Sequence, residues 1–258
     1  MTDLMPVLTQ LSGMGSEMLW AALLVFLRVG AAMALLPAFG EQSVPQRLRL
    51  VLSLAFTAIV APAAGPLPSV EAGVLIPFGV EVLVGLALGI ALRMFIMALQ
   101  IAAAIAANAT SLSQLFGGVG PEPQPAIANL LVMAGLALAV ASGLHVHVAQ
   151  LLILSYQILP AGTVPGSSDM TQWGVAQVAH AFSLGFALAA PFTIASLLYN
   201  IALGVINRAM PALMVSFIGA PALALGGVAL MAIVAPLMLV VWQQSFQTFL
   251  ANPFSGSP

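Results

Sequence analysis

The stretch AGVLIPFGVEVLVGLALGIALRMFIMALQIAAAIAA, residues 72–107, decides the fold class, because it is apolar apart from two charged side chains and Gln100. As one helix, rising about 1.5 Å per residue, it is more than long enough to cross the roughly 30 Å hydrocarbon core of a bilayer. The charged residues, Glu81 and Arg93, lie roughly 18 Å apart along such a helix. They therefore cannot pair with each other, and each needs a partner on another helix.

Glu81, Gly85, Gly89 and Arg93 recur at every fourth position and form a stripe with charged ends and a glycine middle. The spacing of Gly85 and Gly89 lets two helix backbones approach closely. The sequence leaves open whether the second backbone belongs to this chain or to another subunit. Arg28 is a third ionisable residue in an apolar segment, where a charge costs a few kcal/mol unless it is paired or faces water. We therefore expect buried or inter-subunit partners for all three charges.

The rest of the chain has the same character. Of its 258 residues, 62% are hydrophobic and 5% are charged, whereas a soluble domain usually carries about 25% charged residues. The mean hydropathy is +1.14. There are too few polar side chains to cover a water-soluble globule, so the composition predicts a membrane protein. A net charge of −2 without any basic run gives no electrostatic footprint for nucleic acid or for a patch of acidic lipid headgroups, and the lack of cysteine removes disulfides and thiol chemistry.

The hydrophobic pattern predicts an all-α, polytopic membrane protein with about six apolar segments, forming one domain over residues 1–258. The segments are 18–36, 48–64, 72–107, 126–159, 174–206 and 212–242. The last four are longer than a simple span requires. Steep tilt, breaks near Pro77, Pro191 and Pro236, or burial against protein outside the hydrocarbon layer would each explain the excess.

The loop charges predict an orientation. In a six-span alternation, Arg47 and Arg49 fall in the first loop and Arg208 in the fifth. The acids of the tail and of the other loops fall on the opposite side: Asp3, Glu17, Glu71 and Asp169. By the positive-inside rule, both termini then face outward.

No motif in the sequence has the spacing that a metal site or a catalytic site requires. His145 and His147 would point about 200° apart on a helix and cannot bind one ion from one face, and His180 is the remaining histidine. We expect no metal, no cofactor and no catalytic set, since no nucleophile with a positioned base and no paired intramembrane aspartates appear.

The connection SLSQLFGGVGPEPQP, Ser111–Pro125, differs from an ordinary linker. It is apolar at three positions, rich in glycine at three more, and ends in a proline-rich run. These positions are Leu112, Leu115, Phe116, Gly117, Gly118 and Gly120. A solvated linker has no need of the apolar residues, so we interpret this segment as a loop inside a protein cavity.

Two further stretches resemble a known family. One is FLRVGAAMALLPAFGEQSVPQRLRLVLSLAFTAIVAP, Phe26–Pro62, with its P-x-F-G turn and V-P pair; the other is NRAMPALMVSFIGAPALALGG, Asn207–Gly227, with N-R-x-x-P and G-x-P. Both are similar to the FliR family of the flagellar type III export gate, called SctT in injectisomes. The turn positions that carry the likeness are Pro37, Gly40, Pro45, Pro211 and Pro221.

The resemblance implies a non-enzymatic, all-helical subunit with a FliP-like portion and a FliQ-like final hairpin. It implies assembly with FliP and FliQ into a helical pore for unfolded flagellar substrates, in a hetero-oligomer of the bacterial inner membrane. FlhA, FlhB and the membrane ring of the flagellar basal body are the implied neighbours. Much of the assembly would lie above the bilayer plane, with the loop Ser111–Pro125 as part of a plug in the lumen.

Arg208 lies at the turn before the last helix. It is expected to cap carbonyls or to pair with an acid of a neighbouring subunit, the alternative being an anchor that reaches to water. A rival interpretation of the whole chain is a small-solute permease with six spans. A permease often shows duplicated halves, and no internal duplication is evident.

Overall fold

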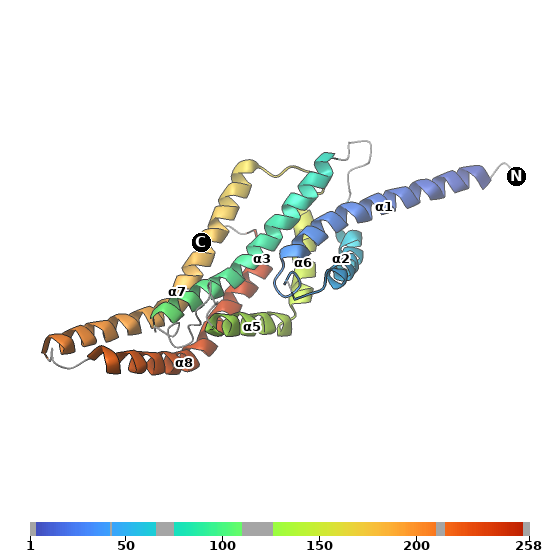
Figure 1. Ribbon diagram of the computed structural model, residues 1–258. Helices are drawn as coiled ribbons and strands as arrows, with labels where there is room; N and C mark the ends of the chain where they lie inside the picture. The colour runs from blue at the N-terminus through green and yellow to red at the C-terminus, as the bar shows by residue number, and fades with distance from the viewer. Residues whose placement is uncertain (1–3, 42, 66–74, 110–125, 210–214, 255–258) are drawn as a thin grey trace. The chain divides into compact units, whose positions relative to one another are not determined.

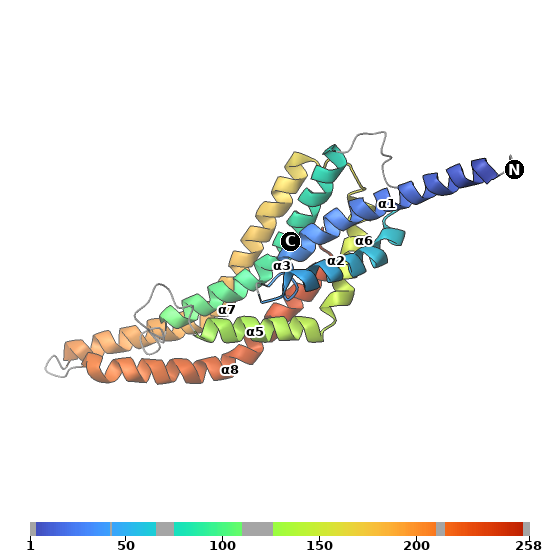
Figure 2. The ribbon, with the colours of Figure 1, turned by 45° about the vertical axis from the view of Figure 1, so that its right-hand side comes forward.

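The computed structural model describes residues 4–41, 43–65, 75–109, 126–209 and 215–254. Within these ranges every regular element is helical, which confirms the all-α prediction (Figures 1 and 2). The elements in chain order are α1 (Leu4–Leu35), α2 (Gln46–Val60), η1 (Ala61–Ala63), α3 (Leu75–Ala109), α5 (Ala126–Ala141), α6 (Leu144–Ile158), α7 (Ser167–Ala209) and α8 (Val215–Ala251).

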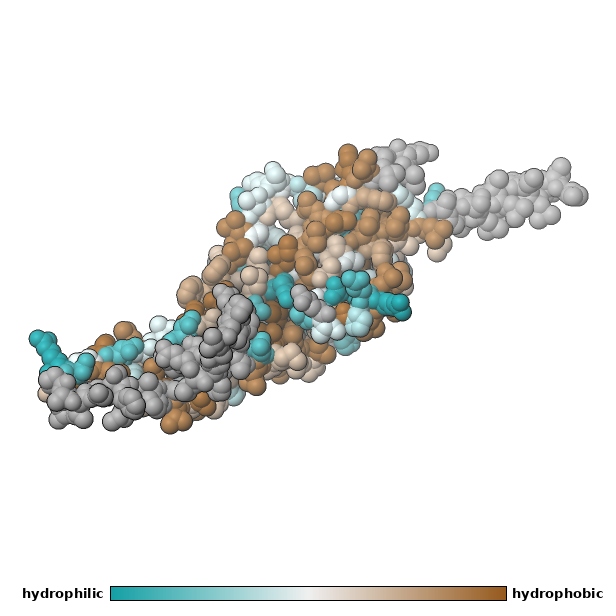
Figure 3. Space-filling model, viewed as in Figure 1, coloured by the Kyte–Doolittle hydropathy of each residue, from teal (hydrophilic) through white to brown (hydrophobic). Residues whose placement is uncertain are grey.

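The number of candidate membrane spans agrees with the six apolar segments of the sequence. Among the described residues, 5 helices are long and apolar enough to cross a bilayer, or up to 6 when α5 and α6 are taken together as one bent span. The surface fits a membrane protein too. Hydrophobic residues, brown in Figure 3, cover much of the visible described surface, and hydrophilic residues form small groups.

The break inside the 126–159 segment comes at a glycine and not at a proline. α5 ends at Ala141 and α6 begins at Leu144, and Gly143 between them has a φ of 84°, in the left-handed region that favours glycine. In contrast, α7 continues through Pro191, and α8 spans Pro236. Pro77 lies in the first turn of α3, where a missing backbone N–H costs nothing. Of the proposed breaks at three prolines, none ends a helix.

One compact unit comprises Met1–Arg93, Gly143–Val175 and Pro253–Gly256. Here α3 packs directly on α1. A Cβ added at Gly85 would overlap the carbonyl oxygen of Arg28, and one added at Gly89 would lie 2.8 Å from the carbonyl oxygen of Ala32. The glycine middle of the stripe therefore serves a close backbone contact within this chain.

The second unit comprises Met94–Ser142, Ala176–Asn252 and Ser257–Pro258. Its described core contains a cluster of aromatic side chains among aliphatic ones. The Trp242 indole donates to the carbonyl oxygen of Phe95 at 2.7 Å, and the Phe246 ring lies 5.2 Å from both the Trp242 and the Phe95 ring centroids. The second part of α7 and α8 run side by side as a hairpin in both views (Figures 1 and 2).

Candidate functional site

The strongest concentration of polar chemistry is an ion pair inside the first unit. Arg28 of α1 and Glu81 of α3 are both completely buried. The Arg28 guanidinium donates two parallel hydrogen bonds to the Glu81 carboxylate, from Nε to Oε2 at 2.8 Å and from Nη2 to Oε1 at 3.1 Å. This bidentate geometry is the strongest form of an arginine–carboxylate pair. The sequence indicated that both charges need partners, and the structure shows that they are partners of each other.

Helix α6 and the segment after it complete the hydrogen bonding of Glu81. The Tyr156 hydroxyl donates to Oε2 at 2.9 Å, and the backbone N–H of Gly162 donates to Oε1 at 3.1 Å. With the two bonds from Arg28, each carboxylate oxygen accepts two hydrogen bonds. A buried charge is tolerated only when its hydrogen-bonding capacity is satisfied in this way.

Arg28 is satisfied by the same elements. Its Nη1 donates to Ser155 Oγ at 3.1 Å and its Nη2 to the carbonyl oxygen of Leu159 at 3.0 Å. The guanidinium carbon also lies 3.7 Å from the centre of the Tyr156 ring, a cation–π contact in a desolvated setting. The network, defined as Arg28, Glu81, Ser155, Tyr156, Leu159 and Gly162, thus fixes α1, α3 and α6 to one another. The sequence reading missed the last four members, since a serine and a tyrosine near the end of an apolar segment carry no distinctive signal.

A second ion pair lies at the turn between α1 and α2. Arg93 of α3 pairs with Glu41, and both side chains are partly exposed, at 35% and 24%. The turn is tight. A Cβ at Gly40 would lie 2.6 Å from the carbonyl oxygen of Ala34. Pro37 and Pro45 flank the turn, and Pro45 is the N-cap residue of α2.

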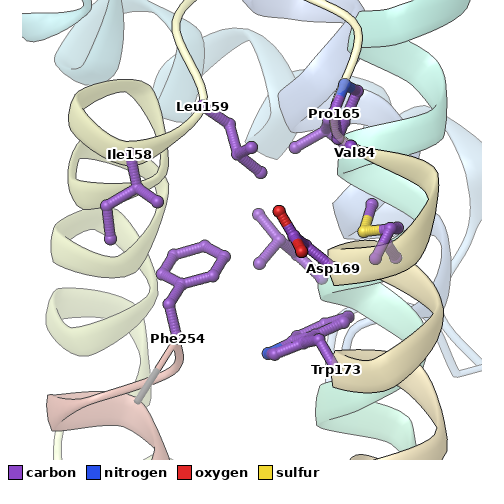
Figure 4. Close-up of a pocket in the computed structure, with 11 residues that line it drawn as sticks. Val84, Ile158, Leu159, Pro165, Asp169, Trp173 and Phe254 are labelled. Atoms are coloured by element: carbon purple, nitrogen blue, oxygen red, sulfur yellow. The ribbon is translucent and has the colours of Figure 1, made fainter. Parts of the chain in front are cut away.

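A cavity of about 300 Å³ lies between α3, the end of α6 and the start of α7. Its walls are mostly apolar, and Figure 4 shows the Asp169 carboxylate beside the rings of Trp173 and Phe254. The two rings stack with their centroids 6.2 Å apart, and the Trp173 indole donates to the carbonyl oxygen of Pro253 at 2.8 Å. The lining contains one carboxylate, that of Asp169, and no nucleophile–base pair.

Sequence comparison identifies relatives of this chain. Residues 19–249 match the family described as "Bacterial export proteins, family 1". The chain is 35% identical over 238 residues to the flagellar biosynthetic protein FliR of Caulobacter vibrioides, covering 90% of this chain and 94% of that protein. It is 30% identical over 243 residues to the FliR of Escherichia coli, covering 90% and 92%. The chain belongs to the FliR family.

Family membership confirms the resemblance seen in the sequence motifs. This FliR-family chain is a non-enzymatic membrane component of flagellar protein export. All six residues of the buried network fall inside the matched region 19–249.

The remaining predicted positions of this FliR-family chain lie in different settings. Arg208 is exposed in the last turn of α7, where a cation is favourable for the helix dipole. The loop Ser111–Pro125 and Pro211 lie outside the described residues, and Pro221 is placed only as part of the α8 backbone. Among the described residues there is no group of three or more histidine or acidic side chains that could hold a metal.

Proposed function

We propose that this FliR-family chain is a core subunit of the flagellar export gate, which assembles with FliP and FliQ into a helical pore for unfolded flagellar substrates in the bacterial inner membrane. The observation that carries the proposal is the length of α7 together with its exposed apolar surface. α7 contains 43 residues. At 1.5 Å per residue it is about 65 Å long, about twice the hydrocarbon thickness of a bilayer.

Lipid can cover only part of such a helix. Several large apolar side chains along α7 are more than half exposed to solvent, among them those of Phe182, Phe186, Ile194, Leu198 and Val205. α8, with 37 residues, has the same character, and Leu225, Ile233 and Leu237 are more than half exposed. Apolar surface beyond the hydrocarbon layer needs protein partners to remove it from water. Neighbouring helical subunits supply such a cover.

The hairpin of α7 and α8 is the part that the resemblance compares with FliQ, and the preceding helices are the part compared with FliP. Repeated hairpins of similar length pack side by side in a heterologous, helical arrangement. FlhA, FlhB and the basal-body ring are proposed as the surrounding partners. Within the pore we assign the loop Ser111–Pro125 to the lumen, as the family resemblance implies.

Co-purification tests this assembly. The tagged chain is produced together with the FliP-like and FliQ-like proteins of the same bacterium, and the extracted complex is weighed by native mass spectrometry. We expect one defined hetero-oligomer. Replacing Phe182 and Phe186 with Gln removes apolar surface from the exposed face of α7 and should lower recovery of the complex. Ser183→Gln adds the same amide at an exposed position that is already polar and serves as the control.

The rival function gives a different result. A small-solute permease works as a single chain or a homo-oligomer with its own binding site near the middle of the membrane. Recovery of a homogeneous homo-oligomer that binds a solute, without FliP-like or FliQ-like protein, would overturn the gate proposal.

A further inference from the structure

A shallow groove in the first unit lies between α1, α2 and α3 and has a volume of about 460 Å³. Most of its wall is apolar and comes from all three helices: Phe26, Leu27, Gly30, Ala31, Leu50, Val82 and Leu86. The polar lining comes from α2 alone, as Gln46, Arg49 and Ser53. The groove is therefore amphipathic, with a long apolar wall and a cationic end.

At this end of the groove, one hydrogen-bond donor of the Arg49 guanidinium lacks an acceptor. Its Nη2 donates to the carbonyl oxygen of Glu41 at 3.1 Å, but its Nε is buried without any acceptor. The nearby Glu41 carboxylate is already engaged by Arg93, and the Ser53 hydroxyl is engaged by the carbonyl oxygen of Arg49 itself. Buried donors nearly always have a partner, so an acceptor from outside the chain is expected.

The net positive charge at the end of the groove favours an anionic ligand. Arg49 and Arg93 lie together with one acid, Glu41, at the end of α1 and α2 where the turn between these two helices lies. The positive-inside rule assigns this end to the cytoplasmic face, where the leaflet carries anionic lipids. The helices that form the groove are themselves candidate membrane spans. An acyl chain would meet the apolar wall from the surrounding bilayer.

We propose that this groove binds one anionic phospholipid, with its phosphate on Arg49 and an acyl chain along the apolar wall. A phosphate supplies the acceptor for Nε and the counter-charge for the guanidinium in one group. A neighbouring protein that offers a carboxylate and apolar side chains is the alternative occupant, and the variants below distinguish it from a lipid. The lipid satisfies both the charge and the apolar wall, and the proposal does not depend on the pore assembly.

Two pairs of variants separate the headgroup from the acyl chain. Arg49→Gln removes the charge from the groove, and Arg47→Gln removes the same charge from an exposed position on the same helix outside the groove lining. Gly30→Leu fills the apolar wall, and Gly30→Ala is its control. A Cβ at Gly30 has only the Phe26 ring within 4 Å, at 3.9 Å, so alanine fits there, and the further atoms of leucine extend from that Cβ.

The measurement is native mass spectrometry of the full-length, delipidated protein titrated with phosphatidylglycerol or with zwitterionic phosphatidylcholine. We expect the parent to retain phosphatidylglycerol in preference to phosphatidylcholine. Arg49→Gln should lower its apparent affinity by roughly tenfold or more, the size expected for a lost charge-assisted hydrogen bond. Gly30→Leu should lower it as well, whereas Arg47→Gln and Gly30→Ala should behave as the parent.

Several outcomes overturn the proposal. If the parent retains both lipids equally, the groove does not recognise the headgroup. If Arg47→Gln loses as much affinity for phosphatidylglycerol as Arg49→Gln does, the binding reflects general surface charge and not the groove. If Arg49→Gln keeps its phosphatidylglycerol in this titration but loses a partner subunit when it is co-purified with the FliP-like and FliQ-like proteins, the occupant is a protein side chain. Should Arg49→Gln fold poorly, the comparison of Gly30→Leu with Gly30→Ala still decides the case.

Discussion

At the scale of single residues, the ion pair of Arg28 and Glu81 is best understood as a complete unit. Taking two charges out of water is expensive, and their attraction offsets that cost only when the remaining hydrogen-bonding positions are filled. Tyr156 and Gly162 fill the positions on the carboxylate, and Ser155 binds the guanidinium. Removing one charge should therefore cost more than neutralising both.

Glu81→Gln tests this coupling. The change leaves Arg28 buried without a counter-ion, and we expect the free energy of unfolding to fall by about 3–5 kcal/mol. The double variant Arg28→Gln with Glu81→Gln keeps two side chains that hydrogen-bond to each other without charge and should recover much of that loss. Thermal unfolding of the detergent-solubilised protein measures both.

The control for this pair is Glu17→Gln, which neutralises an exposed acid on α1. It should leave the unfolding midpoint within the error of the parent, because exposed charges contribute little. A double variant less stable than Glu81→Gln alone would contradict the view that the unpaired charge dominates.

At the scale of the elements, the packing of α3 on α1 depends on where a glycine lies. Gly85 and Gly79 belong to the same helix, yet a Cβ at Gly85 would meet the α1 backbone, and one at Gly79 would meet nothing within 4 Å. Backbone cannot move aside as a flexible side chain can. A glycine in α3 is thus required only where the backbones of α1 and α3 meet.

Alanine at each position gives opposite predictions. Gly85→Ala should destabilise the protein by about 1–3 kcal/mol, because the added methyl group forces α1 and α3 apart. Gly79→Ala should stabilise it by about 0.5–1 kcal/mol, because alanine loses less backbone entropy in a helix. Unfolding midpoints that shift in the same direction for both variants would show that helix propensity, and not the contact, governs this stripe.

The bend between α5 and α6 makes a separate prediction. At Gly143 the only atom near an added Cβ is His147 Nδ1, at 4.0 Å, so a side chain has room but an unfavourable φ of 84°. Gly143→Ala should cost about 1–2 kcal/mol from the backbone alone. Gly174→Ala in α7, also open to a Cβ, is the control and should be neutral or stabilising. Equal midpoints for the two variants would mean that the bend adapts without strain.

At the scale of the whole molecule, the described residues include two ion pairs within the chain, whereas large apolar side chains stay exposed on the surface. Glu81 and Arg93 find partners within the chain, so the requirement for other subunits comes from the exposed apolar faces of α7 and α8. We expect the protein produced alone to be readily degraded and to elute as a broad, heterogeneous species in mild detergent. Production with FliP-like and FliQ-like proteins should protect it, as measured by its half-life in cells. A monodisperse, protease-resistant chain without any partner would argue against this.

The lumen assignment of the loop Ser111–Pro125 also belongs to the whole assembly. Apolar constrictions hold back water and ions by dewetting. Deleting Leu115–Gly120 should leave the complex assembled and make the membrane permeable to ions, as recorded by conductance in cells that produce the full gate. Gln114→Ala, which keeps the loop length and its apolar residues, is the control. An assembled deletion complex that stays as tight as the parent would remove the loop from the lumen.

The sequence was sufficient for the helical membrane class, since long apolar runs have few other solutions. It also singled out Arg28 and Glu81, because a charge in an apolar run is conspicuous. It could not pair them, since their contact joins positions 53 residues apart, and no local pattern encodes such a contact. The bend at Gly143 was missed because a glycine inside an apolar run reads as ordinary, whereas the prolines in α7 and α8 attracted attention without ending either helix.

The buried pair has a consequence for biosynthesis. Arg28 leaves the ribosome 53 residues ahead of Glu81, which at about 5–20 residues per second is a delay of roughly 3–10 seconds. Tyr156 follows another 75 residues after Glu81. During that time the first span carries an uncompensated cation and inserts poorly into lipid. We expect the first and third candidate spans to enter the bilayer together, because pairing with Glu81 lowers the cost of placing Arg28 in lipid.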